Sequence, residues 1–178
     1  QEGLDPCDFI SNELRTYKDY QNWTPKNSDG NHEGFYSVKG GLANSVNTIS
    51  AEIINRIGTR AVIQQAKRMG IESKIPNLPS IALGSADISL YEMVRAYTAF
   101  ANLGQVVYPV SILKIQDWNG EVLWEYQSDE PMDSAMNRET AQVMVEMMKG
   151  VIERGTGKSL RSVYRLKGDY AGKTGTTQ

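Results

Sequence analysis

The stretch GGLANSVNTISAEIINRI, residues 40–57, joins a polar triplet to a clear helix pattern. In its second half the isoleucines recur at three- and four-residue spacing, as Ile49, Ile53, Ile54 and Ile57. This period predicts an amphipathic helix, and Gly58 after it is a typical stop signal. The triplet Ser45-Val46-Asn47 stands just before that helix. The stretch therefore places a hydroxyl and an amide side chain at a helix start.

Three more helices are predicted by the same period, over residues 60–69, 89–104 and 137–154. The middle one has the clearest start, because Ser89 and Glu92 have the spacing of a capping box. In that arrangement the serine hydroxyl accepts from a first-turn N–H and the carboxylate reaches back. Residues 37–104 are therefore expected to form a helical region.

The β structure is predicted mainly between the last two helices, where residues 105–127 are expected to form a β-hairpin. Segments 106–116 and 121–126 are rich in β-branched and aromatic residues, and they flank Asn119-Gly120, a strong turn signal. A last strand is predicted over 169–177, so that residues 137–178 would supply one helix and one strand.

The beginning of the chain, residues 1–36, is polar and turn-rich, and it is expected to be a surface loop segment with at most one short helix. The whole chain is predicted to be one α/β unit of the α+β kind. It would consist of a mostly helical subdomain, a β-hairpin and one or two strands of a larger antiparallel sheet, and thus form an incomplete domain.

The composition limits the class of protein. The chain has 178 residues, of which 40% are hydrophobic and 22% charged, as in an ordinary globular domain. Its net charge of −2 argues against a nucleic-acid-binding protein, which would carry a strong basic excess. No apolar run is long enough to span a membrane, and the first residues lack the pattern of a signal peptide. Any membrane anchor is expected outside this chain.

Cys7 and His32 are the obvious single candidates for other chemistry. A lone cysteine cannot form an internal disulfide, and no Cys/His cluster has the spacing of metal ligands. We expect Cys7 to be a tolerated thiol and His32 a solvated loop residue rather than a general base, although a catalytic site built on His32 stays open. We expect neither a metal nor an organic cofactor.

A second polar motif, Lys173-Thr174-Gly175-Thr176, lies near the end of the chain. Two Gly-Lys pairs, 157–158 and 172–173, resemble the end of a phosphate-binding loop. That loop also needs a glycine five positions before its Gly-Lys glycine, where this chain has Ile152 and Lys167. A nucleotide-binding site is therefore disfavoured.

Taken together, Ser-x-Asn followed by Lys-Thr-Gly is more specific than either motif alone. They are the second and third elements of the set found in penicillin-binding proteins and serine β-lactamases, Ser-x-x-Lys, Ser-x-Asn and Lys-Thr-Gly. Taken alone, Ser-x-Asn could equally be a polar turn before a helix, and Lys-Thr-Gly could equally be part of an ordinary edge strand.

Beyond these motifs, nearly the whole chain resembles the transpeptidase domain of class A penicillin-binding proteins. The resemblance is carried in order by residues 40–47, 82–85, 89–104, 114–123, 151–157 and 171–177. It implies a β-lactamase/transpeptidase-like fold. It also implies peptidoglycan cross-linking by an acyl-serine mechanism, with D-Ala–D-Ala stem peptides as substrates and β-lactams as inhibitors.

The resemblance also implies roles for six residues. Ser45 would relay a proton, Asn47 would orient the substrate amide, and Lys173 would supply positive charge near Ser45. Thr174 and Thr176 would hold the substrate carboxylate, and Gly175 would let substrate backbone approach the strand.

The nucleophile is expected to lie outside this chain, because no Ser-x-x-Lys precedes Ser45. The chain alone is therefore expected to be inactive. The resemblance implies a parent protein anchored at the periplasmic face of the inner membrane, with an upstream glycosyltransferase domain and partner proteins in cell-wall synthesis. Two alternatives stay open: a serine β-lactamase or D,D-carboxypeptidase, and a non-catalytic domain that binds cell-wall peptide or protein.

Overall fold

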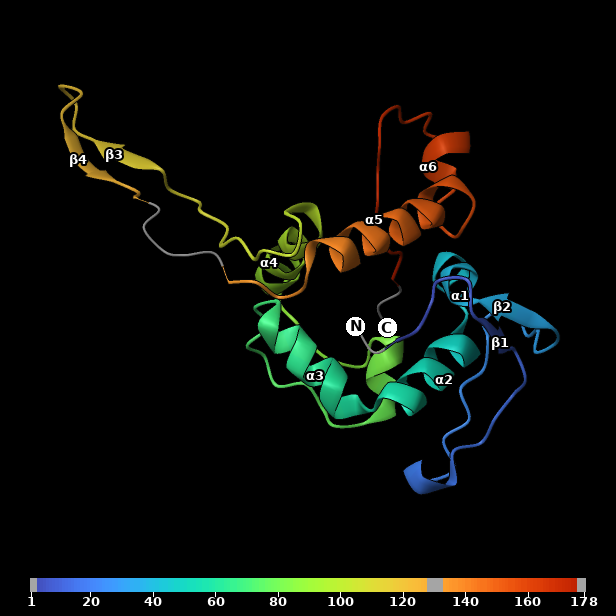
Figure 1. The fold of residues 1–178 in the computed structure, drawn as a ribbon. Coiled ribbons are helices and arrows are strands. Elements are labelled where there is room, and N and C mark those ends of the chain that lie inside the picture. Colours follow the sequence, from blue (N-terminus) through green and yellow to red (C-terminus); the bar gives the residue numbers. More distant parts are fainter. Residues whose placement is uncertain (1–2, 128–132, 176–178) are drawn as a thin grey trace.

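The computed structural model describes residues 3–127 and 133–175 (Figure 1). Its elements, in chain order, are β1 Phe9–Ser11, η1 Lys18–Tyr20, β2 Phe35–Ser37, α1 Val38–Asn44, α2 Asn47–Ile57, α3 Thr59–Arg68, η2 Pro79–Leu83, α4 Leu90–Ala101, β3 Lys114–Gln116, β4 Val122–Glu125, α5 Arg138–Glu153 and α6 Ser159–Ser162. The fold is thus mixed helix and strand with small sheets, as the sequence predicts.

The helices make up the body of the molecule, and α5 lies against both α1 and α4. Helix α5 packs against α1 and against α4, while α2 packs on η2 and α3 (Figure 1). One buried cluster comprises Ala99, Val106, Ala135, Met136 and Ala141, and another comprises Ile10, Val46 and Ile49. The second cluster lies beneath the turn that carries Ser45 and Asn47, so the core supports that turn directly.

The predicted helices are confirmed, because their signals are local in the sequence. Ser89 accepts a hydrogen bond from the Glu92 N–H, and the Glu92 carboxylate accepts from the Ser89 N–H, so the capping box is complete. At the start of α5 the Asn137 side chain accepts from the Thr140 N–H.

The segment expected as a surface loop contains more regular structure than its sequence suggests. Strands β1 and β2 pair antiparallel, with Ile10 opposite Tyr36, and Ile10 is buried. Each strand has three residues, too few to show an alternating pattern in the sequence. The paired segments are also far apart in the chain, which hides their pairing from a local analysis.

The β-hairpin is present but is shorter than predicted. It pairs β3 with β4, with a bulge between Ile115 and Gln116, and its turn contains Gly120 at a φ of 87°. Residues 106–113, predicted as part of the first strand, are not in a strand. Figure 1 shows the hairpin projecting away from the helical body.

The strand predicted over 169–177 is not formed in its described part, residues 169–175. A strand needs a neighbour to satisfy its N–H and C=O groups. Within residues 3–127 and 133–175 no segment pairs with it, so this prediction is wrong for these residues. One backbone bond, from the Gly172 N–H to the Met148 carbonyl at 3.4 Å, holds the segment against α5. Thr176 and Thr177 lie outside the described residues.

Candidate active site

Ser45 lies in the tight turn between α1 and α2. Its φ of 55° and ψ of 47° are left-handed, which is uncommon for a residue with a side chain. Its N–H bonds back to the Leu42 carbonyl, and the next residue, Val46, is buried in the core. The turn therefore ends α1, starts α2 two residues later and leaves the Ser45 side chain outside both helices.

Lys173 meets Ser45 across 128 positions of sequence, as the motif pair predicts. Its Nζ donates to Ser45 Oγ at 2.8 Å and to the Thr174 carbonyl at 2.8 Å. Burial lowers the pKa of the Lys173 ammonium group from its ordinary value. A lysine at this distance can polarise the serine hydroxyl and exchange a proton with it.

Asn47 is the first residue of α2, and its side chain is held by the loop before β2. Its Nδ2 donates to the Lys26 carbonyl at 2.8 Å. A carbonyl only accepts, so this contact fixes which end of the amide is nitrogen. The amide oxygen of Asn47 consequently points away from Lys26 and is the end available to another donor.

The loop that holds Asn47 is itself fixed by Asn27, which the sequence analysis did not single out. Asn27 Oδ1 accepts from the Thr48 N–H at 3.1 Å and so caps α2 from another part of the chain. Asn27 Nδ2 donates to the Asn31 carbonyl and to Asn12 Oδ1, and Asn12 is buried.

Thr174 follows Lys173 and does not stand alone. Its Oγ1 lies 2.6 Å from Thr156 Oγ1, in the turn after α5. Gly175 lies in open space, since an added Cβ would meet no atom within 4 Å. The described residues thus give no steric need for glycine there. Thr176 lies outside the described residues, and its role stays a prediction.

Gly155 and Thr156 join α5 to the end of α1, a function that sequence reasoning missed. A Cβ on Gly155 would come within 2.1 Å of the Ala43 carbonyl oxygen, so only glycine fits this approach without rearrangement. The Thr156 N–H donates to the same oxygen at 3.0 Å. In the sequence the run Gly155-Thr156-Gly157 signals a helix stop but not this contact.

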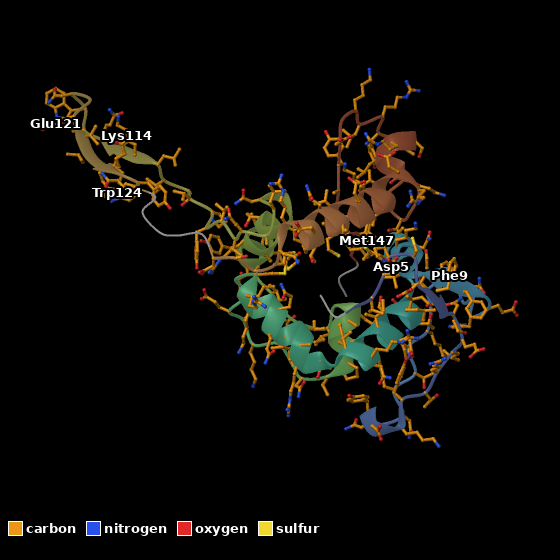
Figure 2. The ribbon with its side chains drawn as sticks, viewed as in Figure 1. Asp5, Phe9, Lys114, Glu121, Trp124 and Met147 are labelled. Carbon is orange, nitrogen blue, oxygen red and sulfur yellow. The ribbon has the colours of Figure 1, made fainter. Side chains whose placement is uncertain are left out.

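No Ser-x-x-Lys precedes Ser45, but this spacing does occur later in the chain, at Ser111 and Lys114. Both residues are exposed, and Lys114 lies on β3, paired with Glu125 of β4. Figure 2 labels Lys114 on the projecting hairpin, well apart from the helices that carry Ser45. This serine is therefore not placed to work with Ser45 and Lys173.

Cys7 and His32 each contact another residue of the chain. Cys7 is exposed, and its Sγ lies 3.2 Å from Lys39 Nζ. His32 is half-buried rather than solvated, and its Nε2 accepts from the Asn27 N–H at 3.2 Å. The described residues contain no group of three or more acidic, histidine or cysteine side chains placed to hold a metal. They also contain no helix that is both long and apolar enough to cross a membrane.

Comparisons with a protein-family model and with curated proteins both point to penicillin-binding proteins. Residues 1–178 match the family described as "Penicillin binding protein transpeptidase domain". Among curated proteins, penicillin-binding protein 1A from Aquifex aeolicus is 33% identical over 88% of this chain and 21% of its own length. Penicillin-binding protein 1A from Neisseria gonorrhoeae is 34% identical over 87% of this chain and 20% of its own length. The chain thus spans about a fifth of these relatives.

Solved structures share the fold. Penicillin-binding protein 1A from Haemophilus influenzae superposes with a TM-score of 0.89 at 24% identity, over 99% of this chain and 32% of that one. PonA1 from Mycobacterium tuberculosis, in complex with penicillin V, gives a TM-score of 0.79 at 22% identity, over 99% of this chain and 49% of that one.

Proposed function

Because this chain belongs to the penicillin-binding protein transpeptidase domain family, we propose that it supplies two of three catalytic motifs to a serine D,D-transpeptidase that cross-links peptidoglycan. The observation that carries the proposal is the 2.8 Å hydrogen bond from Lys173 Nζ to Ser45 Oγ. It brings together two of the three motifs that the chemistry requires, from positions far apart in the sequence.

In the proposed reaction, a serine outside this chain attacks the carbonyl carbon between two D-Ala residues of a stem peptide. Its Oγ bonds that carbon, the C–N bond to the terminal D-Ala breaks, and the leaving amine takes a proton. An amine of a neighbouring stem peptide then attacks the ester carbon and forms a new amide C–N bond. The C–O bond to the serine breaks, and the proton that the amine loses returns to the serine Oγ.

Ser45 and Lys173 support the proton transfer in this scheme. Ser45 Oγ both donates and accepts, so it can pass a proton to the leaving nitrogen and be resupplied from Lys173 Nζ. The charge on Lys173 also attracts the carboxylate of the terminal D-Ala, or of a β-lactam. Asn47, with its amide oxygen turned away from Lys26, would orient the stem-peptide amide. Thr174, Gly175 and Thr176 would line the carboxylate end.

The parent protein is proposed to be extracytoplasmic, anchored by a segment outside this chain, and to carry a glycosyltransferase domain as well. A hydrolase is the second candidate, because a β-lactamase or D,D-carboxypeptidase uses the same motifs with water as acceptor. The family match to transpeptidases favours the cross-linking reaction.

The test is intact-mass analysis of the parent protein before and after incubation with a labelled penicillin. We expect one adduct, lost when an upstream Ser-x-x-Lys serine is replaced by alanine. Lys173→Ala should slow its formation by about a hundredfold, as removal of a group in a proton-transfer path does. Lys167→Ala, at an exposed lysine nearby, is the control and should react like the wild type. A folded parent without any adduct would refute the proposal and favour a peptide-binding role.

A further inference from the structure

Thr156 touches both segments that carry the proposed catalytic motifs. Its N–H donates to the carbonyl of Ala43, which is two residues before Ser45, at 3.0 Å. Its Oγ1 lies 2.6 Å from Oγ1 of Thr174, the residue after Lys173. One residue thereby links the end of α1 to the Lys-Thr-Gly segment.

The backbone of Thr156 has little freedom to move. The preceding Gly155 lies directly against the Ala43 carbonyl, and the Gly157 N–H donates to the Val151 carbonyl at 2.9 Å. Val151 is fully buried in α5. The Thr156 hydroxyl is therefore presented from a rigid turn.

The Lys-Thr-Gly segment, by contrast, has few ties to the body. In residues 169–175 the other ties to the body comprise a 3.4 Å backbone bond to Met148, a 3.7 Å ion pair between Lys149 and Asp169, the Lys173–Ser45 bond, and the Arg161 guanidinium over the Tyr170 ring at 5.6 Å from the ring centroid. The 2.6 Å contact from Thr156 is shorter than each of these and is adjacent to Lys173.

We propose that Thr156 is a positioning residue that holds Lys173 at bonding distance from Ser45 and fixes the direction of the Thr174 hydroxyl. Each hydroxyl has one proton, so the pair forms one bond, in one of two directions. When Thr174 donates its proton to a substrate carboxylate, Thr156 must be the donor to Thr174. The Thr174 hydroxyl then donates to the substrate and accepts from Thr156, so both hydrogen bonds hold it in place. This inference rests on the proposed transpeptidase function.

The test uses the full-length parent protein and the rate constant of acylation by a labelled penicillin. Thr156→Val removes the hydroxyl, keeps the side-chain shape and keeps the N–H bond to Ala43. We expect acylation to slow by about tenfold, the order of effect of losing one hydrogen bond. Thr156→Ser keeps the hydroxyl and should stay close to the wild-type rate. Ser159→Ala, which removes an exposed hydroxyl in α6, is the matched control and should have no effect.

A double-mutant cycle separates positioning from a general loss of stability. If Thr156 acts through Thr174, Thr156→Val should slow the Thr174→Val variant little further, because the bond is already lost. The melting temperature is measured for each variant. Slowing without a large melting shift, together with rescue by serine and non-additivity, supports the inference.

The outcomes distinguish this inference from the proposal beneath it. A wild-type parent that is never acylated would refute the transpeptidase function itself. A parent that is acylated and slowed by Lys173→Ala, but reacts normally as Thr156→Val, would overturn only the role of Thr156. Additive effects of the two threonine substitutions would overturn it as well.

Discussion

The side chain of Asn47 is oriented by the loop that contains Lys26 and Asn27, which belongs to neither motif. Asn27 caps α2 through the Thr48 N–H, and the neighbouring Lys26 carbonyl accepts from the Asn47 side chain. The residue before α2, Val46, cannot provide a side-chain cap, so the cap comes from a distant loop. The same loop therefore stabilises the helix start and aims the amide.

Replacing Asn27 by alanine should weaken the start of α2. Loss of an N-terminal cap typically costs about 1 kcal/mol of unfolding free energy, and we expect a loss of that order here. Urea unfolding of the parent protein, followed by circular dichroism, measures it. Acylation by penicillin should slow too, because the Lys26 carbonyl is less firmly placed.

Asn55→Ala provides the comparison, because Asn55 is an exposed residue of the same helix. Alanine is a better helix former than asparagine, so this variant should be as stable as the wild type or slightly more stable. Equal stability of the two alanine variants would contradict the capping role of Asn27.

Among the helices, α4 shows how a local signal acquires a tertiary function. The Glu92 carboxylate accepts from the Ser89 N–H and hydroxyl, as the capping box predicts. It also accepts from the Ser73 hydroxyl and from the N–H groups of Glu72 and Ser73. The start of α4 is thereby fastened to the loop after α3.

These hydrogen bonds make the stability of this junction depend on pH. Those from Ser73 and then Ser89 lower the Glu92 pKa from 4.5 to about 2. A carboxyl with a lowered folded-state pKa stabilises the fold above its unfolded pKa, and this contribution is lost as the pH falls toward the folded value. The melting-temperature advantage of wild type over Glu92→Gln should thus shrink between pH 4.5 and pH 2. An advantage that stays constant over this window would contradict the assignment.

The elements show which parts of the structure a sequence can reveal. Helix α4 was predictable because Ser89 and Glu92 are three residues apart and their pattern is local. The β1–β2 pair was not, because Ile10 and Tyr36 meet only through the fold. Of the site, Ser45 and Lys173 follow from family motifs, and the structure joins them. Thr156 and Asn27 act through contacts to Thr174 and Thr48, which no spacing pattern encodes.

At the scale of the whole molecule, a helical body carries a hairpin with an apolar surface. Leu113, Trp118 and Leu123 are 68%, 92% and 65% exposed. Figure 2 shows the side chains of the hairpin, including Trp124, well apart from the helices. A two-stranded ribbon is marginally stable by itself, so the helical body rather than the hairpin determines the stability of the site.

The 178-residue chain alone should not become covalently labelled by penicillin, because the proposed nucleophile lies outside it. Intact-mass analysis of the isolated chain, with the full-length parent as positive control, measures this. An adduct mapped to Ser111, the serine with the Ser-x-x-Lys spacing, would refute the assignment of the nucleophile. Ser111→Ala in the parent should leave acylation unchanged, since Ser111 is an exposed residue of the segment that leads into the hairpin.

The Ser45–Lys173 bond also has a consequence in time. During synthesis, 128 residues separate the appearance of the two partners. At roughly 5–20 residues per second, Ser45 waits on the order of ten seconds for Lys173. Closing so long a loop costs configurational entropy that the hydrogen bond alone does not offset. The helices between them must therefore assemble first. The Ser45–Lys173 bond thus forms only in a chain whose intervening residues have already folded.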